Sequence, residues 1–458
     1  MHPVFVKAGT ANAVPILFVT AANMDEATKI LDDRERAFVR AAGFEPKAGK
    51  HLIVPDTDGN LAGVLFGLEA ANDPARDLFR PGALAGVLPP GTYRFANAPH
   101  DTRLAALSFA LANYQFTRYR KGSEREVKLV VPDGVDGDDL TRIADAVTLC
   151  RDLINTPSND MGPAEIEEAA RKLAAQHKAE IAVISGEPLE KGFPLIHAVG
   201  KGSPRAPRLI DITWGKANDP KITLVGKGVA FDTGGLDLKP SSGMLNMKKD
   251  MGGGATALAL GHMIMAAALK VRLRVLVPAV ENSISGISFR PRDVYISRKG
   301  LSVEIGNTDA EGRLILADTL ALADEEKPDL IVDFATLTGA ARVAMGPEVS
   351  PFFTDDDHLA GELMAAGTAE FDPLWRLPLW RPYDSMLDSK VADFNNVGSS
   401  GHGGAITAAL FLRRFVEARS WLHFDIFAWN GASKPARPEG GELMTARALY
   451  ALLKARYS

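Results

Sequence analysis

Short apolar runs alternate along the chain with longer segments in which apolar residues recur every three or four positions. The first pattern predicts strands and the second predicts helices, since these are the spacings that place apolar side chains on one buried face. In the first third of the chain, strands are expected over residues 16–20, 61–67 and 127–131, and helices over residues 25–42 and 101–114. This part is therefore predicted to be an α/β module.

The same alternation continues through the rest of the chain with more continuous apolar runs. Strands are expected over residues 180–184, 209–214, 221–226, 271–280, 329–335 and 423–427. Helices are expected over residues 163–177, 255–269, 313–325 and 405–418. Apolar strands that alternate with helices are typical of a largely parallel sheet covered on both faces, in which ligands bind at the carboxyl ends of the strands.

A glycine-rich turn at residues 134–137 and a helix expected over residues 138–154 separate the two parts. The single cysteine of the chain, Cys150, shares an apolar face of this helix and is expected in the core. With 458 residues, the chain exceeds the length at which a single core stops growing. We therefore predict an α/β protein with an N-terminal α/β domain, a connecting helix and a larger catalytic domain, over residues 1–135, 136–155 and 156–458.

Composition adds that the chain is an ordinary soluble globular protein, with 46% apolar and 24% charged residues. The net charge is −5, and residues 1–126 hold 15 Lys and Arg against 14 Asp and Glu, so nucleic acid is not expected as a partner. No signal peptide and no membrane span are expected from the apolar runs. A lone cysteine suits a reducing compartment, and we predict a cytoplasmic location.

Candidate chemistry gathers in two stretches, Val225–Asp250 (VGKGVAFDTGGLDLKPSSGMLNMKKD) and Asn307–Leu314 (NTDAEGRL). They contain four carboxylates, two lysines and one arginine that stand out: Lys227, Asp232, Lys239, Asp250, Asp309, Glu311 and Arg313. Four carboxylates carry about four negative charges, which matches two divalent cations. One lysine can then be a neutral nitrogen ligand and the other a cation that faces the substrate.

Local pattern suggests how these groups are presented. Lys227 lies between two glycines where an apolar strand is expected to give way to a loop, and Gly234-Gly235 behind Asp232 predicts a tight turn. Asp309, Glu311 and Arg313 alternate, so an extended backbone before a helix would send all three to one side. The glycines at residues 252–254 leave a phosphate-binding helix start as an alternative.

The two stretches resemble the signature of the M17 leucyl aminopeptidase family, or cytosol aminopeptidases, and NTDAEGRL matches residue for residue. The resemblance implies metal ligands at Lys227, Asp232, Asp250, Asp309 and Glu311, with Asp232 and Glu311 shared by both metals. It implies catalytic roles for Lys239 and Arg313, with a bicarbonate ion at Arg313. Thr233, Lys249 and Gly254 depart from common family residues without removing a ligand.

Further stretches resemble the family's substrate site. The segment ATLTGA, residues 335–340, implies that Thr336, Leu337 and Gly339 contact the substrate, with Met247 as an apolar wall. Phe427 stands where alanine is usual, which bears on the family's preference for leucine. The resemblance also implies a homohexamer.

We therefore predict a hydrolase that removes N-terminal residues, leucine and other apolar residues among them, from peptides with two zinc or manganese ions, or magnesium. Two alternatives remain from the residues alone. Carboxylate pairs also suit a two-metal phosphoesterase. A peptidase with an additional DNA-binding role rests on analogy with relatives.

Overall fold

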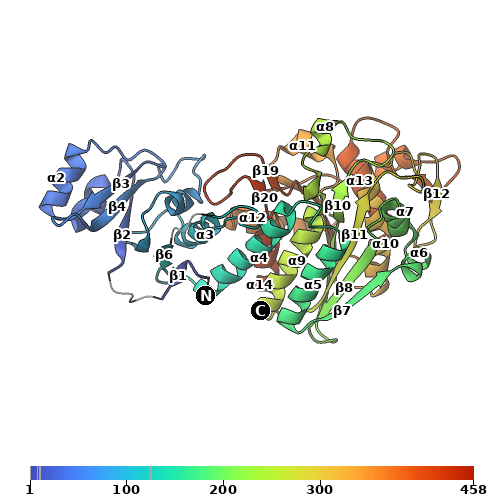
Figure 1. Cartoon of the computed structure of the whole chain (residues 1–458), viewed down its shortest axis with the longest axis horizontal. Helices are drawn as coiled ribbons and strands as arrows, with labels where there is room; N and C mark the ends of the chain where they lie inside the picture. The colour runs from blue at the N-terminus through green and yellow to red at the C-terminus, as the bar shows by residue number, and fades with distance from the viewer. Residues whose placement is uncertain (1, 8, 10–11, 123–125) are drawn as a thin grey trace. The chain divides into compact units, whose positions relative to one another are not determined.

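The computed structural model describes residues 2–7, 9, 12–122 and 126–458 (Figure 1). The chain forms two compact units: the first runs to Thr148 and includes Gly431–Glu439, and the second comprises Leu149–Asn430 and Gly440–Ser458. The predicted domain limits stay a prediction. The return of Gly431–Glu439 to the first unit was not expected from the sequence.

The first unit is built on a six-stranded sheet of order β1-β6-β5-β2-β4-β3, in which only the β3–β4 pair is antiparallel. The strands are β1 (Phe5–Val6), β2 (Val14–Val19), β3 (His51–Pro55), β4 (Leu61–Gly67), β5 (Gly91–Phe95) and β6 (Val127–Val130). The helix α3 (Thr102–Ala112) lies where it was predicted. These elements confirm the α/β character of this part.

The helix predicted over residues 25–42 is wrong as a single element. It is divided into α1 (Met24–Ala27), a short 3₁₀ turn and α2 (Asp33–Ala41). Asp32 is the N-cap of α2. Its carboxylate accepts from the backbone N–H of Glu35, and the Glu35 side chain accepts from the backbone N–H of Asp32. Such a capping box starts a new helix.

The second unit is built on a nine-stranded mixed sheet of order β16-β15-β18-β14-β9-β11-β8-β7, with β10 also paired to β11. The central strands β18, β14, β9 and β11 run parallel, and β8, β7 and β15 pair antiparallel. The bounds are β7 (Glu180–Ser185), β8 (Arg208–Trp214), β9 (Lys221–Gly226), β10 (Gly228–Asp232), β11 (Arg272–Asn282), β14 (Leu330–Ala335), β15 (Ser350–Phe353), β16 (Leu374–Arg376) and β18 (Trp421–Asp425).

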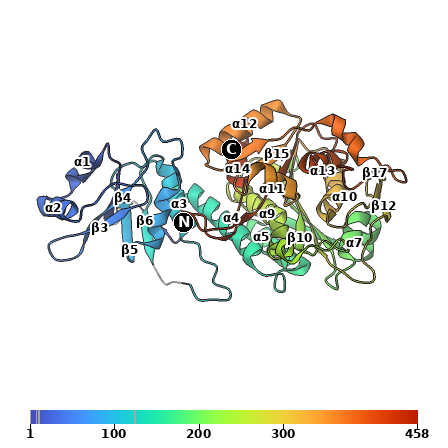
Figure 2. The same cartoon turned by 90° about the horizontal axis from the view of Figure 1, so that it is seen from above.

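Helices cover both faces of this sheet, as Figure 2 shows from above. One face packs on α5 (Pro163–His177), α9 (Gly252–Ala266) and, behind α9, α14 (Ala446–Tyr457). The other packs on α7 (Pro194–Gly200), α10 (Glu311–Glu325) and α13 (Gly404–Arg413), which share one hydrophobic core with the strands. The remaining elements of this unit include α6 (Glu187–Gly192), α8 (Ser241–Met244), α11 (Gly339–Met345), α12 (Asp357–Ala369), β12 (Val294–Ile296), β13 (Ser302–Glu304), β17 (Phe394–Asn395), β19 (Trp429–Asn430) and β20 (Gly440–Gly441).

Two predicted ends were too long. The helix expected to residue 418 ends at Arg413, because the Asp324 carboxylate accepts from the backbone N–H groups of Glu417 and Ala418 and holds them outside the helix. The strand expected to residue 427 ends at Asp425, since Ala428 adopts a left-handed conformation with φ of +57° that no strand continues through.

The connecting helix α4 (Gly137–Asn155) confirms the prediction, and Cys150 on it is fully buried. Next to Cys150, the fully buried Arg151 donates from Nη2 to Glu442 Oε2 at 2.9 Å. Asn430 Nδ2 donates to the same oxygen at 2.7 Å. The pair thus ties α4 to the segment that precedes α14.

We expect Arg151→Met to lower the free energy of unfolding by about 3 to 5 kcal/mol, because it leaves the Glu442 carboxylate buried without its cation. Thermal unfolding of the variant measures this loss. The double variant Arg151→Met/Glu442→Leu is the control, since removal of both charges restores stability. Equal midpoints for the wild type and the single variant would contradict the expectation.

Candidate metal centre

Lys227 lies at the carboxyl end of β9, but the loop predicted there is wrong. Lys227 alone separates β9 from β10, and both strands run parallel to β11. The flanking glycines serve close packing: a Cβ at Gly226 would lie 2.5 Å from the Gly253 carbonyl oxygen, and one at Gly228 2.7 Å from that of Pro278. The chain therefore stays extended, and the Lys227 side chain points into the protein, 3% exposed.

Asp232 ends β10, and the tight turn predicted behind it is confirmed. Gly234 and Gly235 have φ of +89° and +66°, which residues with a Cβ rarely adopt. The Asp232 Oδ1 atom accepts from the backbone N–H of Gly234 and from Asn282 Nδ2, both at 2.9 Å. Its other oxygen is turned toward Lys239 on the returning segment.

Asp250 lies on a 3₁₀ turn, Met247–Met251, that leads directly into α9. The glycines that open α9 let it approach the strands, since a Cβ at Gly253 would lie 2.1 Å from the Phe334 carbonyl oxygen. The Gly254 N–H donates to the carbonyl oxygen of Lys227 at 2.8 Å. The glycines therefore serve close packing, and the Gly254 N–H already has an acceptor. Neither observation supports a phosphate-binding site at the start of α9.

The backbone from Asp309 to Arg313 is not extended, so the condition under which alternation would place the three side chains on one side is not met. Asp309 lies in a turn, and Glu311 is the first residue of α10. The Asn307 side chain accepts from the Asp309 N–H at 2.7 Å and closes this turn, which brings Asp309 and Glu311 together by a route other than strand alternation. Arg313 diverges, with its Nη1 donating to the Asn396 carbonyl oxygen at 2.6 Å.

The side chains from these segments converge at one point. Ligand oxygens of Asp232, Asp309 and Glu311 all lie within 4.8 Å of one another. The Lys227 Nζ atom lies 2.8 Å from Asp250 Oδ2 and 2.8 Å from Glu311 Oε1. Lys239 bridges the other two carboxylates, with its Nζ 2.9 Å from Asp232 Oδ2 and in contact with Asp309.

Several oxygens at this point are buried without a regular hydrogen bond from any described residue: Asp250 Oδ2, Asp309 Oδ1, Glu311 Oε1 and Glu311 Oε2. Their nearest cations are the two lysine ammonium groups. Buried carboxylates are stable only when they are paired or coordinate a metal. Hard oxygen donors with one lysine nitrogen fit divalent cations in number, charge and position.

The electrostatics show how crowded the carboxylates are. Burial and the neighbouring Asp250 raise the pKa of Asp232 to about 6. Burial and Asp232 hold the pKa of Glu311 well above its usual range. Burial alone would lower the pKa of Lys227, but Asp250 and Glu311 raise it. Additional positive charge therefore stabilises this group of side chains.

Three residues that support the centre were not identified from the sequence. Asn282 at the end of β11 donates to Asp232 Oδ1 and to the Thr308 carbonyl oxygen. Asn396 accepts from the Gly306 N–H at 2.7 Å, and Asp425 accepts from the segment after β14. Asn282 and Asp425 each end a parallel strand of the sheet, and that position is the signal that could have found them.

Comparison with known proteins agrees with this geometry. The profile of the cytosol aminopeptidase family, catalytic domain, matches residues 148–453, and that of the M17 aminopeptidase N-terminal domain matches residues 14–132. The chain belongs to the cytosol aminopeptidase family. It is therefore an aminopeptidase of a metal-dependent family, and the alternatives of a phosphoesterase and of an additional DNA-binding role are not favoured.

Individual cytosol aminopeptidases match over nearly the whole chain. A probable cytosol aminopeptidase from Sinorhizobium medicae is 35% identical over 482 residues, covering 98% of this chain and 97% of the relative. The crystal structure of the cytosol aminopeptidase from Coxiella burnetii superposes with a TM-score of 0.95 at 45% identity, covering 99% and 100% of the two chains. The bottromycin maturation enzyme BotP in complex with Mn gives a TM-score of 0.85 at 33% identity, covering 97% and 99%.

The segment matched to the substrate loop of cytosol aminopeptidases follows β14 beside the centre. Thr336 donates from Oγ1 to Asp250 Oδ1 at 2.7 Å, and its carbonyl oxygen accepts from Lys227 Nζ at 3.0 Å. Asp425 accepts from the N–H groups of Leu337 and Thr338, both at 3.1 Å. Thr336 thus orients the Asp250 carboxylate of the centre. Gly339 borders open space, since no atom lies within 4 Å of a Cβ built there.

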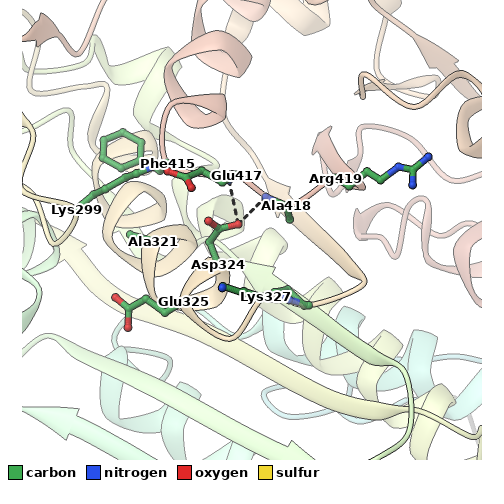
Figure 3. A pocket seen from close by; sticks show the side chains of 10 residues that line it. Lys299, Ala321, Asp324, Glu325, Lys327, Phe415, Glu417, Ala418 and Arg419 are labelled. Atoms are coloured by element: carbon green, nitrogen blue, oxygen red, sulfur yellow. Dashed lines mark hydrogen bonds and ion pairs between the residues drawn. The ribbon is translucent and has the colours of Figure 1, made fainter.

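The second unit also contains a pocket of about 510 Å³ that none of the centre's residues lines, and Figure 3 shows its lining side chains. It is lined by residues that come just before β14 and β18, such as Lys327 and Arg419, and so lies at the amino ends of these strands. Three of its charged groups are engaged within the protein: Asp324 accepts from two backbone N–H groups, and Lys299 pairs with Glu417 at 3.0 Å. This pocket takes no part in the centre.

Along the ranges that the structure describes, no helix combines the length and the low polarity needed to cross a bilayer.

Proposed function

We propose that the chain hydrolyses N-terminal residues, leucine and other apolar residues included, from peptides with two divalent ions. Lys227, Asp232, Asp250, Asp309 and Glu311 would hold the ions, with Asp232 and Glu311 shared. The observation that carries the proposal is the set of buried carboxylate oxygens that lack regular hydrogen bonds within a few ångströms of one another. Zinc or manganese is proposed, with magnesium as the alternative, and the manganese complex of the similar BotP supports manganese.

Two bound divalent ions supply Lewis acidity, which lowers the pKa of water and polarises a carbonyl group. The protein side chains supply the rest. Burial alone would lower the pKa of Lys239, but Asp232 and Asp309 raise it, so this side chain stays a cation. In the proposed reaction, Lys239 stabilises the negative charge that develops on the scissile carbonyl oxygen.

Arg313 would bind a small anion, for which bicarbonate is proposed. The guanidinium is nearly fully buried, and its Nε atom donates to no acceptor among the described residues. Burial lowers the pKa of Arg313 to about 10, which still leaves it charged at neutral pH. A buried donor without a partner is costly, and a bound anion would satisfy it.

A homohexamer in the cytoplasm is proposed from the family. Loops that carry exposed large apolar side chains support an assembly, among them Leu238 at 57%, Leu245 at 78% and Ile287 at 65% exposed. The mass in solution, compared with 49.0 kDa for one chain, tests it.

The experiment that tests the function compares leucine p-nitroanilide, N-acetyl-leucine p-nitroanilide and p-nitrophenyl phosphate as substrates. An aminopeptidase cleaves only the first, since it requires a free amino group. Cleavage of the phosphate ester alone would overturn the proposal.

Phe427 is expected to influence which N-terminal residue is preferred. Its ring is half-buried just beyond the end of β18, close to the Arg342 guanidinium. One methylene in an apolar pocket is worth about 1 to 3 kcal/mol. Phe427→Ala should therefore change the ratios of kcat/KM among Leu, Met, Phe and Ala substrates by at least about tenfold, and with them the ranking. Values of kcat/KM for the four amides measure it, and an unchanged ranking would place Phe427 outside the pocket.

A further inference from the structure

Lys249 is a buried cation next to Asp250. The residue is 7% exposed, and its Nζ atom lies 5.0 Å from the centre of the Phe427 ring. Within the described part of the chain, Lys249 Nζ makes no hydrogen bond and no ion pair. A buried charge is costly unless it is paired, so an ammonium group without an anion is unusual.

The neighbouring lysine shows the contrast. Lys248 Nζ donates to the Asn155 carbonyl oxygen at 2.7 Å and lies 5.5 Å from the centre of the Trp429 ring. Its role is accounted for by contacts within the protein. Lys248 is therefore a suitable control for Lys249, because it is the adjacent lysine and its ammonium group has a backbone acceptor.

Two carboxylates are already engaged: that of Asp250, next to Lys249 in the chain, and that of Asp425, which pairs with the Arg342 guanidinium beside the same ring. Asp250 receives Lys227 at 2.8 Å on one oxygen and Thr336 Oγ1 at 2.7 Å on the other. Asp425 is paired with Arg342 at 3.0 Å. Lys227 and Lys239, the other cations nearby, are each bracketed by carboxylates of the centre. Of these three lysines, Lys249 is thus the one that forms no ion pair with a described residue, although Asp250 is its neighbour in the chain.

The Lys249–Phe427 contact lies beside the loop that is proposed to receive the substrate. The Arg342 guanidinium, 5.1 Å from the centre of the same ring, donates to the Thr338 carbonyl oxygen at 3.0 Å. Thr338 lies within the segment from Thr336 to Gly339, and the position of Gly339 is open. The ammonium, the ring and this loop therefore border one region next to the centre.

We propose that Lys249 makes the pocket for the N-terminal side chain favour acidic residues, glutamate and aspartate, and disfavour lysine and arginine. The proposal rests on the aminopeptidase function proposed above. A substrate carboxylate would supply the missing partner, and charge-assisted hydrogen bonds are about twice as strong as neutral ones. Substrates with a second ammonium group would meet an unscreened like charge.

The test compares Glu, Gln, Leu and Lys p-nitroanilides, because Gln has nearly the shape of Glu without its charge. We expect kcat/KM for Glu to exceed that for Gln by at least about tenfold in the wild type. Lys249→Met should bring this ratio to about one. Lys249→Glu should reverse the order of the Glu and Lys substrates. Lys248→Met is the matched control and should leave the Glu to Gln ratio unchanged.

Inhibition by free L-glutamate and L-glutamine gives a second measurement, since the ratio of their inhibition constants should change in parallel. Bound metal is measured for each variant, because Lys249 adjoins Asp250. If Lys249→Met fails to fold, the Glu to Gln ratios of kcat/KM for Lys249→Gln and for the wild type still test the proposal.

A wild-type ratio near one, or a ratio that Lys249→Met leaves unchanged, overturns the proposal, as does an equal fall with Lys248→Met. Cleavage of the Leu substrate without a Glu preference overturns this inference alone. Metal-loaded protein that cleaves none of the four substrates overturns the proposed function instead.

Discussion

Removal of bound divalent ions with a chelator is expected to reduce peptidase activity by more than about a hundredfold, since metal ions supply several kcal/mol of transition-state stabilisation. Addition of Mn²⁺ or Zn²⁺ should restore it. The physical reason is the group of buried carboxylates, which brings four negative charges together around two lysine ammonium groups. Activity measured with metal content per chain, before and after dialysis against the chelator, checks the result.

The same expectation has a pH dependence. Burial and Asp250 raise the pKa of Asp232 to about 6, so protons compete with metal at this carboxylate more than at an ordinary aspartate. Metal affinity should therefore fall as pH decreases through about 6 and be retained above it. A titration of bound metal between about pH 5 and 8, the range in which such a group changes its charge, measures this. Full activity in protein without metal would exclude the mechanism.

The second large effect separates the two lysines of the centre. Lys239→Ala should lower kcat by about 10² to 10³, the size seen when one oxyanion donor is removed, while bound metal persists. Lys227→Ala should instead lower metal occupancy, with activity partly recovered at high metal concentration. The positions support the difference: Lys227 Nζ lies 2.8 Å from both Asp250 and Glu311, whereas Lys239 contacts Asp232 and Asp309 and is the more exposed of the two lysines.

Metal content and kcat are measured together for both variants. Lys248→Met serves as control, because it removes an ammonium group that bonds to Asn155 outside the centre. If Lys239→Ala loses its metal, or Lys227→Ala retains both ions, the proposed roles of the lysines are reversed or wrong.

The amino-acid sequence by itself determined the positions of most strands and helices. The predicted α5, from Pro163 to His177, is found at the same residues, and the buried strand that ends before Lys227 is found as β9. Such elements follow from local periodicity and from the end signals of proline and glycine, which act within a few residues. The residues of the candidate centre were also named from the sequence, because an eight-residue motif with charged groups at fixed spacing is specific.

Only the tertiary structure decided how those residues meet. Glycines before and after Lys227 suggested a loop, yet they pack against α9 and β11, elements that the local sequence does not contain. Alternation suggested an extended segment at Asp309, yet a side chain two residues away closes a turn and α10 begins at Glu311. Local pattern cannot distinguish a glycine that turns the chain from one that lets another segment approach.

The supporting partners show the same limit over longer separations. Asn282 reaches Asp232 across 50 positions of the chain, and Thr336 reaches Asp250 across 86. Lys249 likewise lies against the ring of Phe427, which is far along the sequence. Periodicity reports which face of an element is buried, but which side chains share a site depends on the order in which strands assemble, and that order is a property of the folded sheet.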